Sequence, residues 1–209
     1  MKFIDQLQER FGIILASSSP RRKQLLASIG LVFKTIIPNV DEKRITFDNQ
    51  PQNHCQFLSV VKAMNVYNNL VDLSPKIIIA ADTIVVLDNE IINKPEDADE
   101  AVYFLKKLSN NRHKVFTGIS VLDSTNGRLN CRYASTDVYF RKLSDAEIMD
   151  YVGTGSPLDK AGGYGIQDAY GRLFVKKIDG CYNNVVGLPL ELLYEMLQNI
   201  CKLTLRPIQ

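Results

Sequence analysis

The 209-residue chain is predicted to be an α/β protein built around a mixed β-sheet. Two observations lead to this fold class. Apolar, strand-like segments alternate along the chain with segments of helical periodicity, which is typical of α/β proteins. In addition, residues 114–142 read as two strands around the turn "STNGR" (124–128), and such a hairpin makes the sheet mixed rather than purely parallel.

The elements are expected in the following order. Phe3, Leu7 and Phe11 recur at helical spacing, so a short N-terminal helix comes first. No repeat or long linker interrupts the rest, and we expect one domain over residues 1–209 with residues 1–12 as an additional helix. The strands are predicted at 13–16, 33–37, 77–87, 114–122, 133–142 and 172–178. The helices that follow the first are predicted at 20–29, 54–70, 96–108, 144–152 and 188–202.

Composition and charge exclude several classes of protein. A hydrophobic content of 45% and a charged content of 23% are ordinary for a globular protein. The net charge is only +2, and no basic stripe with interleaved aromatic residues is present, so a nucleic-acid partner is not expected. No apolar run reaches the ~18 residues of a membrane span. The first residues carry charges among their apolar positions, unlike a secretion signal, and we expect a cytoplasmic protein.

The cysteines and histidines are too few and too scattered for a zinc site. The cysteines show no paired spacing, which argues for a reducing compartment and for a role as small core residues. With only two histidines, an imidazole-rich metal centre is excluded. These residues are Cys55, Cys131, Cys181 and Cys201, with His54 and His113.

The stretch "LASSSPRR" (15–22) has an unusual charge at a helix start. Ser19 reads as an N-cap and Pro20 as the first helical residue, so Arg21 and Arg22 fall in the first turn. Backbone amides there already carry about half a positive charge. Either the arginines point into solvent, at a cost of ~0.3–1 kcal/mol each, or they bind a phosphate together with those amides. We favour the phosphate, although neither a Walker loop nor a dinucleotide motif is present.

Asp82 interrupts the nearly continuous apolar strand expected at 77–87. A carboxylate inside a buried strand costs several kcal/mol unless it is paired or binds a metal. One interpretation is that local backbone groups and threonine hydroxyls satisfy it. The interpretation that we favour is a base or a metal ligand at the floor of a cleft, because no cation lies nearby in the sequence.

Four further charged residues could contribute to the same chemistry. Asp41 and Glu42 follow a strand and are either a solvated turn or hard oxygen ligands of the kind that Mg²⁺ prefers. Lys62 lies in the helix at 54–70, and Lys94 precedes a proline; each alone reads as a surface lysine.

The stretch "GSPLDKAGGYGIQDAYGRLF" (155–174) combines glycines, a cation and an amide. Gly162, Gly163 and Gly165 would let the backbone approach a ligand, although an irregular hairpin loop explains them equally well. Lys160 adds a positive charge, and Gln167 offers both a donor and an acceptor that could read a nucleobase edge. Together with the phosphate and carboxylate groups, this loop points to a nucleotide-handling enzyme.

These stretches resemble the Maf family, which are nucleoside triphosphate pyrophosphatases also called septum-formation inhibitors. The resemblance covers about residues 13–195, because several motifs occur in family order. It implies a fold like that of the inosine triphosphatases, with a bent mixed sheet, two lobes and a deep cleft. It also implies hydrolysis of a nucleoside triphosphate to the monophosphate and pyrophosphate with Mg²⁺, or with Mn²⁺ or Co²⁺ instead. The motifs are "LASSSPRR", "VDE", "KA" (62–63), "AADTIV", "KP" (94–95), "HKVFTG", "PLDKAGGYGIQ" and "NVVGLPL".

Site residues carry over by position from this resemblance. Asp82 matches the proton acceptor that would activate the attacking water, and Glu42 with Asp82 matches the metal contacts. Arg21, Thr83 and Gln167 match the branch that acts on dTTP and UTP rather than on 7-methyl-GTP. A glutamine amide supports this branch, because it can donate to a pyrimidine carbonyl and accept from N3–H. The substrate-binding residues are Ser17, Arg21, Arg22, Lys62 and Lys94, to which the loop cation Lys160 is added.

The resemblance leaves alternatives and departures. A 7-methyl-GTP-type pyrophosphatase and a non-catalytic nucleotide-binding regulator of cell division stay open, as does a homodimer. Ser18 replaces a glycine that is usual in the family, and Cys181 replaces an aspartate or serine. Ser156 replaces a glutamate before Pro157, and the loss of this acid could weaken lysine positioning or metal binding nearby. The helix at 1–12 has no counterpart in the family core and would serve packing or dimer contacts.

Overall fold

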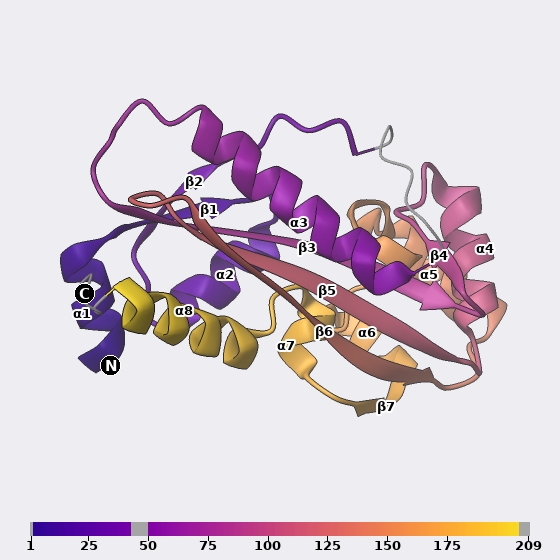
Figure 1. Cartoon of the computed structure of the whole chain (residues 1–209). Helices are drawn as coiled ribbons and strands as arrows, with labels where there is room; N and C mark the ends of the chain where they lie inside the picture. The colour runs from indigo at the N-terminus through magenta and orange to yellow at the C-terminus, as the bar shows by residue number, and fades with distance from the viewer. Residues whose placement is uncertain (1, 43–49, 205–209) are drawn as a thin grey trace. The chain divides into compact units, whose positions relative to one another are not determined.

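The computed structural model describes residues 2–42 and 50–204, with side chains up to residue 200 (Figure 1). The predicted core packing of Cys201 therefore lies outside the described side chains. The strands are β1 (Gly12–Ala16), β2 (Phe33–Ile36), β3 (Lys76–Leu87), β4 (Glu90–Ile92), β5 (Arg112–Asp123), β6 (Arg128–Phe140) and β7 (Val175–Asp179). The helices are α1 (Lys2–Arg10), α2 (Pro20–Ser28), α3 (Pro51–Asn68), α4 (Ala98–Leu108), α5 (Asp145–Gly153), α6 (Ala169–Phe174), α7 (Tyr182–Val186) and α8 (Leu190–Thr204), with the short 3₁₀ turns η2 (Ser156–Asp159) and η3 (Ala161–Gly163).

The strands of the described chain form a seven-stranded mixed sheet, which confirms the predicted fold class. The order is β2-β1-β3-β5-β6-β7, and β4 pairs with β3. β1 is parallel to β2 and to β3, whereas β4 is antiparallel to β3 and β7 is antiparallel to β6. The predicted turn joins β5 to β6, and the Asp123 carboxylate accepts hydrogen bonds from the backbone and hydroxyl of Thr125.

The chain divides into two compact units. The first unit contains residues 1–82, 118–133 and 187–209, and the second contains residues 83–117 and 134–186. Strands β3, β5 and β6 each run from one unit into the other. Asp82 is therefore the last residue of its segment in the first unit.

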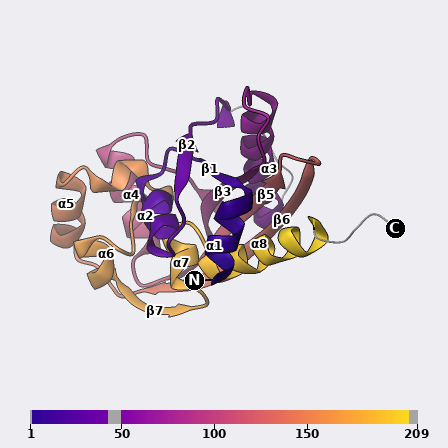
Figure 2. The ribbon, with the colours of Figure 1, turned by 90° about the vertical axis from the view of Figure 1, so that its left-hand side faces the viewer.

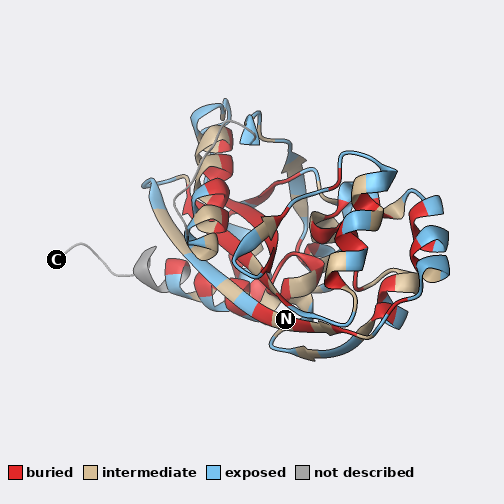
Figure 3. Cartoon of the chain, turned by 90° about the vertical axis from the view of Figure 1, so that its right-hand side faces the viewer, coloured by how far each residue is buried: buried red, intermediate tan, exposed pale blue. Residues whose placement is uncertain are grey.

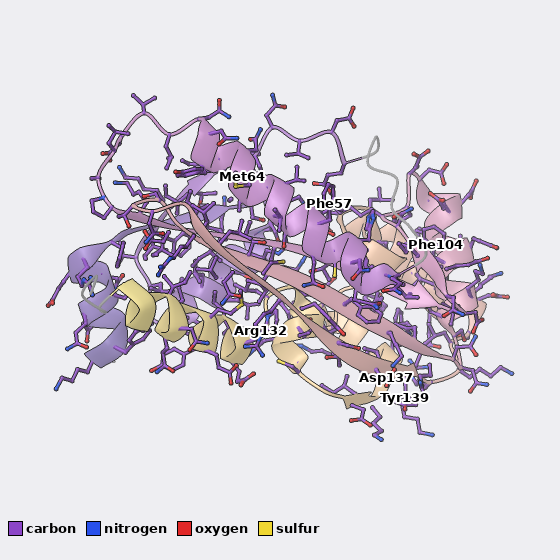
Figure 4. All side chains as sticks on the ribbon, viewed as in Figure 1. Phe57, Met64, Phe104, Arg132, Asp137 and Tyr139 are labelled. Atoms are coloured by element: carbon purple, nitrogen blue, oxygen red, sulfur yellow. The ribbon has the colours of Figure 1, made fainter. Side chains whose placement is uncertain are left out.

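The core of the first unit lies between α3 and the parallel strands. Side chains of β1 and β3 pack against Ala63 and Val66 on the buried face of α3, which Figure 3 shows in red. Figure 4 labels two further residues of this helix: Met64 packs against the core, whereas Phe57 is exposed. The strand residues are Ile14, Ala16, Ile78 and Ala80.

The N-terminal helix is present as predicted, and it packs on the first unit. Leu7 and Phe11 are buried, together with Ile4. The ring of Phe3 meets that of Tyr194 on α8 edge-to-face at 5.3 Å, so that α1 lies beside α8 (Figure 2). Among the described residues, the helices include none long and apolar enough to cross a bilayer.

The prediction of a strand over 172–178 is partly wrong. Residues up to Phe174 belong to α6, and the strand begins only at Val175. The carbonyl of Asp168 accepts the amide of Arg172 at 3.0 Å, which starts a helical turn that the apolar pattern hides. The short elements β4 and α7 were not expected either, because three to five residues are too few to show a period.

Candidate active site

The start of α2 has the predicted capping geometry. The Ser19 hydroxyl accepts the amide of Arg22 at 3.4 Å, and Pro20 is the first helical residue. Ser17 begins the loop after β1 and is buried, and its hydroxyl accepts the amide of Ser19 at 3.2 Å. The strand, the hydroxyl loop and the helix start therefore form one hydrogen-bonded unit.

Arg22 does not point into solvent. Its Nε donates to the carbonyl of Gly187 at 2.8 Å, and its Nη1 donates to the hydroxyl of Ser17 at 3.2 Å. The charge that the helix start disfavours thus has acceptors within the protein, so a bound phosphate is not required to explain Arg22. Arg21, its neighbour, is half-buried.

Electrostatics link Arg22 to the acidic part of the site. Burial lowers the pKa of Arg22, while the carboxylates of Asp82 and Glu42 act against this shift. Arg21 lowers the same pKa by repulsion. Arg22 therefore interacts electrostatically with Arg21 and with the two carboxylates within the first unit.

Asp82 is held by a lysine that is distant in sequence. Its Oδ1 accepts the Nζ of Lys62 at 2.6 Å, and both side chains are buried. The same ammonium lies 2.9 Å from Oε1 of Glu42, whose side chain is half-exposed. The interpretation of Lys62 as a surface lysine is therefore wrong, and so is that of an Asp82 satisfied by local groups.

The carboxylates of Asp82 and Glu42 are candidate ligands for a divalent metal. Asp82 and Glu42 both reach the position of the Lys62 ammonium, so hard oxygen donors converge on one cation. Among the described residues, no group of three or more histidines, cysteines or acids could hold a metal ion. Two protein carboxylates suit Mg²⁺ when phosphate oxygens and water complete its six ligands.

The predicted loop of the second unit turns its lysine inward. Lys160 is buried, and its Nζ donates to the carbonyl of Ser156 at 2.5 Å and to Oδ1 of Asp159 at 2.6 Å. The Ser156 hydroxyl lies 3.1 Å from the same atom, and Oδ2 of Asp168 lies 3.4 Å from it. A serine at position 156 thus contacts Lys160 directly, and the carboxylates of Asp159 and Asp168 supply the negative charge.

Two of the loop glycines are required by packing within the protein. Gly162 has a φ of +71°, and a side chain there would meet Val85 at 3.0 Å. A side chain at Gly165 would lie 2.7 Å from Cε of Lys160 and 2.8 Å from Oδ2 of Asp168. The protein's own side chains occupy the space that the missing Cβ atoms leave.

Three more of the predicted residues belong to the second unit. Oε1 of Gln167 is buried and has no hydrogen-bond partner among the described residues. Lys94 is exposed, and the carbonyl of Asn93 beside it accepts the amide of Gly162 at 3.0 Å, which ties the glycine loop to this segment. The hydroxyl of Thr83 lies 2.9 Å from that of Thr117.

The structure therefore places six of the predicted residues in the first unit and the other four in the second. The first group is Ser17, Arg21, Arg22, Glu42, Lys62 and Asp82, and the second group is Thr83, Lys94, Lys160 and Gln167. Asp168, which contacts Lys160, could not be singled out from the sequence, since an acid in a polar loop is ordinary. The buried pair of His113 and Tyr164, with Nε2 and Oη 2.7 Å apart, was also missed, although it lies in two of the quoted motifs.

The comparisons with known proteins agree with these motifs. Residues 12–200 match the family model described as Maf-like protein. The chain belongs to the Maf family. A protein of Clostridium beijerinckii is 43% identical over 188 residues, covering 90% of this chain and 98% of that protein. A protein of Clostridium tetani is 44% identical over 187 residues, covering 90% and 96%.

A third relative, from Caldicellulosiruptor saccharolyticus, is 43% identical over 189 residues, covering 90% of this chain and 94% of that protein. All three relatives are described as dTTP/UTP pyrophosphatases. The resemblance of this Maf-family chain to that branch is therefore confirmed.

Proposed function

We propose that the chain hydrolyses dTTP, UTP and modified pyrimidine nucleoside triphosphates to the monophosphate and pyrophosphate. The observation that carries this proposal is the buried Asp82 carboxylate, which is paired with the Lys62 ammonium that Glu42 also contacts. A protein that only binds nucleotides has no use for a buried carboxylate that can take a proton. Relatives at 41–44% identity that are described as dTTP/UTP pyrophosphatases support the same substrate class.

In the proposed mechanism, Asp82 acts as the general base. Its carboxylate takes a proton from a water molecule as that oxygen bonds to the α-phosphorus. The bond from the α-phosphorus to the bridging oxygen breaks, and pyrophosphate leaves with the electron pair. Lys62 keeps the carboxylate in place through the 2.6 Å contact.

The remaining residues bind and orient the substrate in this proposal. Cations and the Ser17 hydroxyl neutralise and hold the phosphates. A divalent ion such as Mg²⁺, or Mn²⁺ or Co²⁺ in its place, would be held by Glu42 and Asp82 and would withdraw charge from the phosphate oxygens. The proposed phosphate-binding cations are Arg21, Arg22, Lys62, Lys94 and Lys160.

In this proposal, Arg21, Thr83 and Gln167 recognise the nucleobase of the substrate. The unpartnered Oε1 of Gln167 can accept a hydrogen bond from N3–H of uracil or thymine, and its amide group can donate to a ring carbonyl. We further propose that the chain acts in the cytoplasm as one Maf-type domain, without a nucleic-acid partner, and that it removes non-canonical nucleotides and restrains cell division. A homodimer is consistent with this proposal.

The test is pyrophosphate release with Mg²⁺ across a panel of dTTP, UTP, 5-methyl-UTP, pseudo-UTP, CTP, GTP, ITP and 7-methyl-GTP. We expect strong activity confined to the thymidine and uridine nucleotides. Activity mainly on 7-methyl-GTP would support a pyrophosphatase but would overturn the proposed specificity for pyrimidine nucleobases. Nucleotide binding without turnover of any of the panel would instead support a regulator of division.

A further inference from the structure

Asp168 lies at the centre of a hydrogen-bonded cluster in the second unit. Its Oδ2 accepts the hydroxyl of Tyr151 at 2.9 Å and the hydroxyl of Ser156 at 2.8 Å. The Nζ of Lys160 lies 3.4 Å from the same oxygen. One carboxylate oxygen therefore joins helix α5, turn η2 and the lysine of the glycine loop.

Tyr151 fixes this cluster to a rigid element. The side chain is fully buried on α5, and its ring centroid lies 5.4 Å from that of Phe174 on α6. Burial raises the pKa of Tyr151, and the charge of Asp168 raises it further, so the hydroxyl keeps its proton and donates it. The same oxygen accepts the amide of Gly165 at 3.2 Å, which anchors the loop backbone as well.

Asp168 also holds the end of the loop that carries Gln167. Its own amide donates to the carbonyl of Gly165 at 2.9 Å and closes a turn around Ile166 and Gln167. A side chain at Gly165 would collide with both the Lys160 chain and the Asp168 carboxylate. The lysine, the carboxylate and the turn are thus packed together with no room to shift separately.

We propose that Asp168 is a positioning residue that sets both the phosphate-binding ammonium of Lys160 and the base-reading amide of Gln167. This inference rests on the proposed function, since it takes Lys160 and Gln167 to be the groups that contact the nucleotide. Asp168 itself contacts no substrate. Its carboxylate contacts the Lys160 ammonium directly, and it reaches the turn that carries Gln167 through the Tyr151 hydroxyl, which accepts the amide of Gly165. Loss of the carboxylate therefore affects phosphate binding and nucleobase discrimination together.

The experiment compares Asp168→Asn, Asp168→Ala and Asp159→Asn in the full-length chain. Asp159 is the matched control, because it contacts the same ammonium at 2.6 Å from an exposed turn eight residues before Gln167. For Asp168→Ala we expect KM for UTP to rise about tenfold, which corresponds to the loss of one charge-assisted contact network, with a smaller change in kcat. The preference for UTP over CTP should fall with it, whereas Asp159→Asn should keep that preference.

A rescue variant separates positioning from general loosening of the fold. The Ser156 hydroxyl is 3.1 Å from the Lys160 ammonium and 2.8 Å from Oδ2 of Asp168, so an acid at position 156 can supply the charge that Asp168→Ala removes. We expect Ser156→Glu in the Asp168→Ala background to restore most of the KM for UTP. A double variant no better than Asp168→Ala, or an Asp159→Asn variant that loses base preference equally, would overturn the proposal.

A binding measurement makes the result independent of turnover. UMP and inorganic pyrophosphate are each titrated into every variant by calorimetry. We expect Asp168→Asn to raise the Kd for both ligands. Unchanged binding of both would overturn the inference even where the nucleotide panel supports the proposed function. If the wild-type chain binds these ligands but hydrolyses nothing, the proposed function fails while Asp168 is still tested. Asp168→Asn is nearly isosteric, so it provides the comparison if Asp168→Ala does not fold.

Discussion

At the scale of single residues, Lys62 lies between the carboxylates of Asp82 and Glu42. A buried lysine would be costly alone, and a buried aspartate would be costly as well. Each charge offsets the desolvation of the other, because the two atoms are 2.6 Å apart. The half-exposed Glu42 adds a second acceptor at 2.9 Å. The position of the Asp82 carboxylate therefore depends on a cation from another element, α3.

Asp82→Asn tests the role of this carboxylate. The amide keeps the shape of the side chain but cannot take a proton from water, so we expect hydrolysis of UTP to fall by about 10²–10⁴-fold. Nucleotide affinity measured by calorimetry should stay within several-fold of wild type. Asp72→Asn, on an exposed loop acid of the same unit, is the control and should keep full activity. Normal turnover by Asp82→Asn would remove Asp82 as the base.

At the scale of elements, α3 rests on β5 at a position without a side chain. A Cβ added to Gly118 would lie well under 3.0 Å from the carbonyl of Cys55 on α3. Only glycine lets the helix backbone come this close to the strand. The φ of Gly118 is not in the left-handed region, so the requirement is one of space alone.

Gly118→Ala should therefore destabilise the protein by overpacking. We expect a loss of about 1–3 kcal/mol in the free energy of unfolding. The atoms that the new Cβ would meet, the carbonyl of Cys55 and the amide nitrogen of Gln56, are backbone and cannot rotate away. Gly153→Ala at the end of α5 is the matched control, since a Cβ there meets nothing within 4 Å. Urea denaturation monitored by circular dichroism measures both. Equal stability of the two variants would contradict a tight contact between α3 and β5.

The elements were predictable to the extent that local pattern determines them. The capped start of α2 and the turn between β5 and β6 carry turn and cap residues, and both formed as expected. Asp82 was singled out because a charge in an apolar run is visible in the sequence. Its partner Lys62 was not, since an ion pair between α3 and β3 depends on tertiary packing. The contacts of Asp168 with Tyr151, Ser156 and Lys160 also depend on tertiary packing and could not be predicted from the sequence.

At the scale of the whole molecule, a buried histidine makes stability depend on pH. His113 is 1% exposed, and its Nε2 lies 2.7 Å from the hydroxyl of Tyr164. Burial lowers its pKa to about 3, although the charge of Asp137 acts in the opposite direction. The folded protein thus holds His113 neutral, while the unfolded chain binds a proton near pH 6.5.

The stability that comes from a neutral His113 is complete above pH 6.5 and is lost as the pH falls toward 3. The slope is about 1.4 kcal/mol per pH unit, so the loss between pH 6.5 and 5 is roughly 2 kcal/mol. His113→Gln should be less stable at pH 7 but should show a flatter dependence over this range. Urea midpoints at several pH values measure the slope. His54→Gln is the control, and a wild-type slope that survives in His113→Gln would assign the effect elsewhere.

The close contact of Gly118 with α3 also bears on the position of Lys62, which the same helix carries. Cys55, which touches Gly118, and Lys62, which holds Asp82, are seven residues apart on the buried face of the same helix, or about 10 Å along its axis. A contact between two backbones has no rotamers, so it fixes the distance between α3 and β5 at this point. The strand that carries Gly118 is therefore one of the supports that fix the position of the Lys62 ammonium beside Asp82.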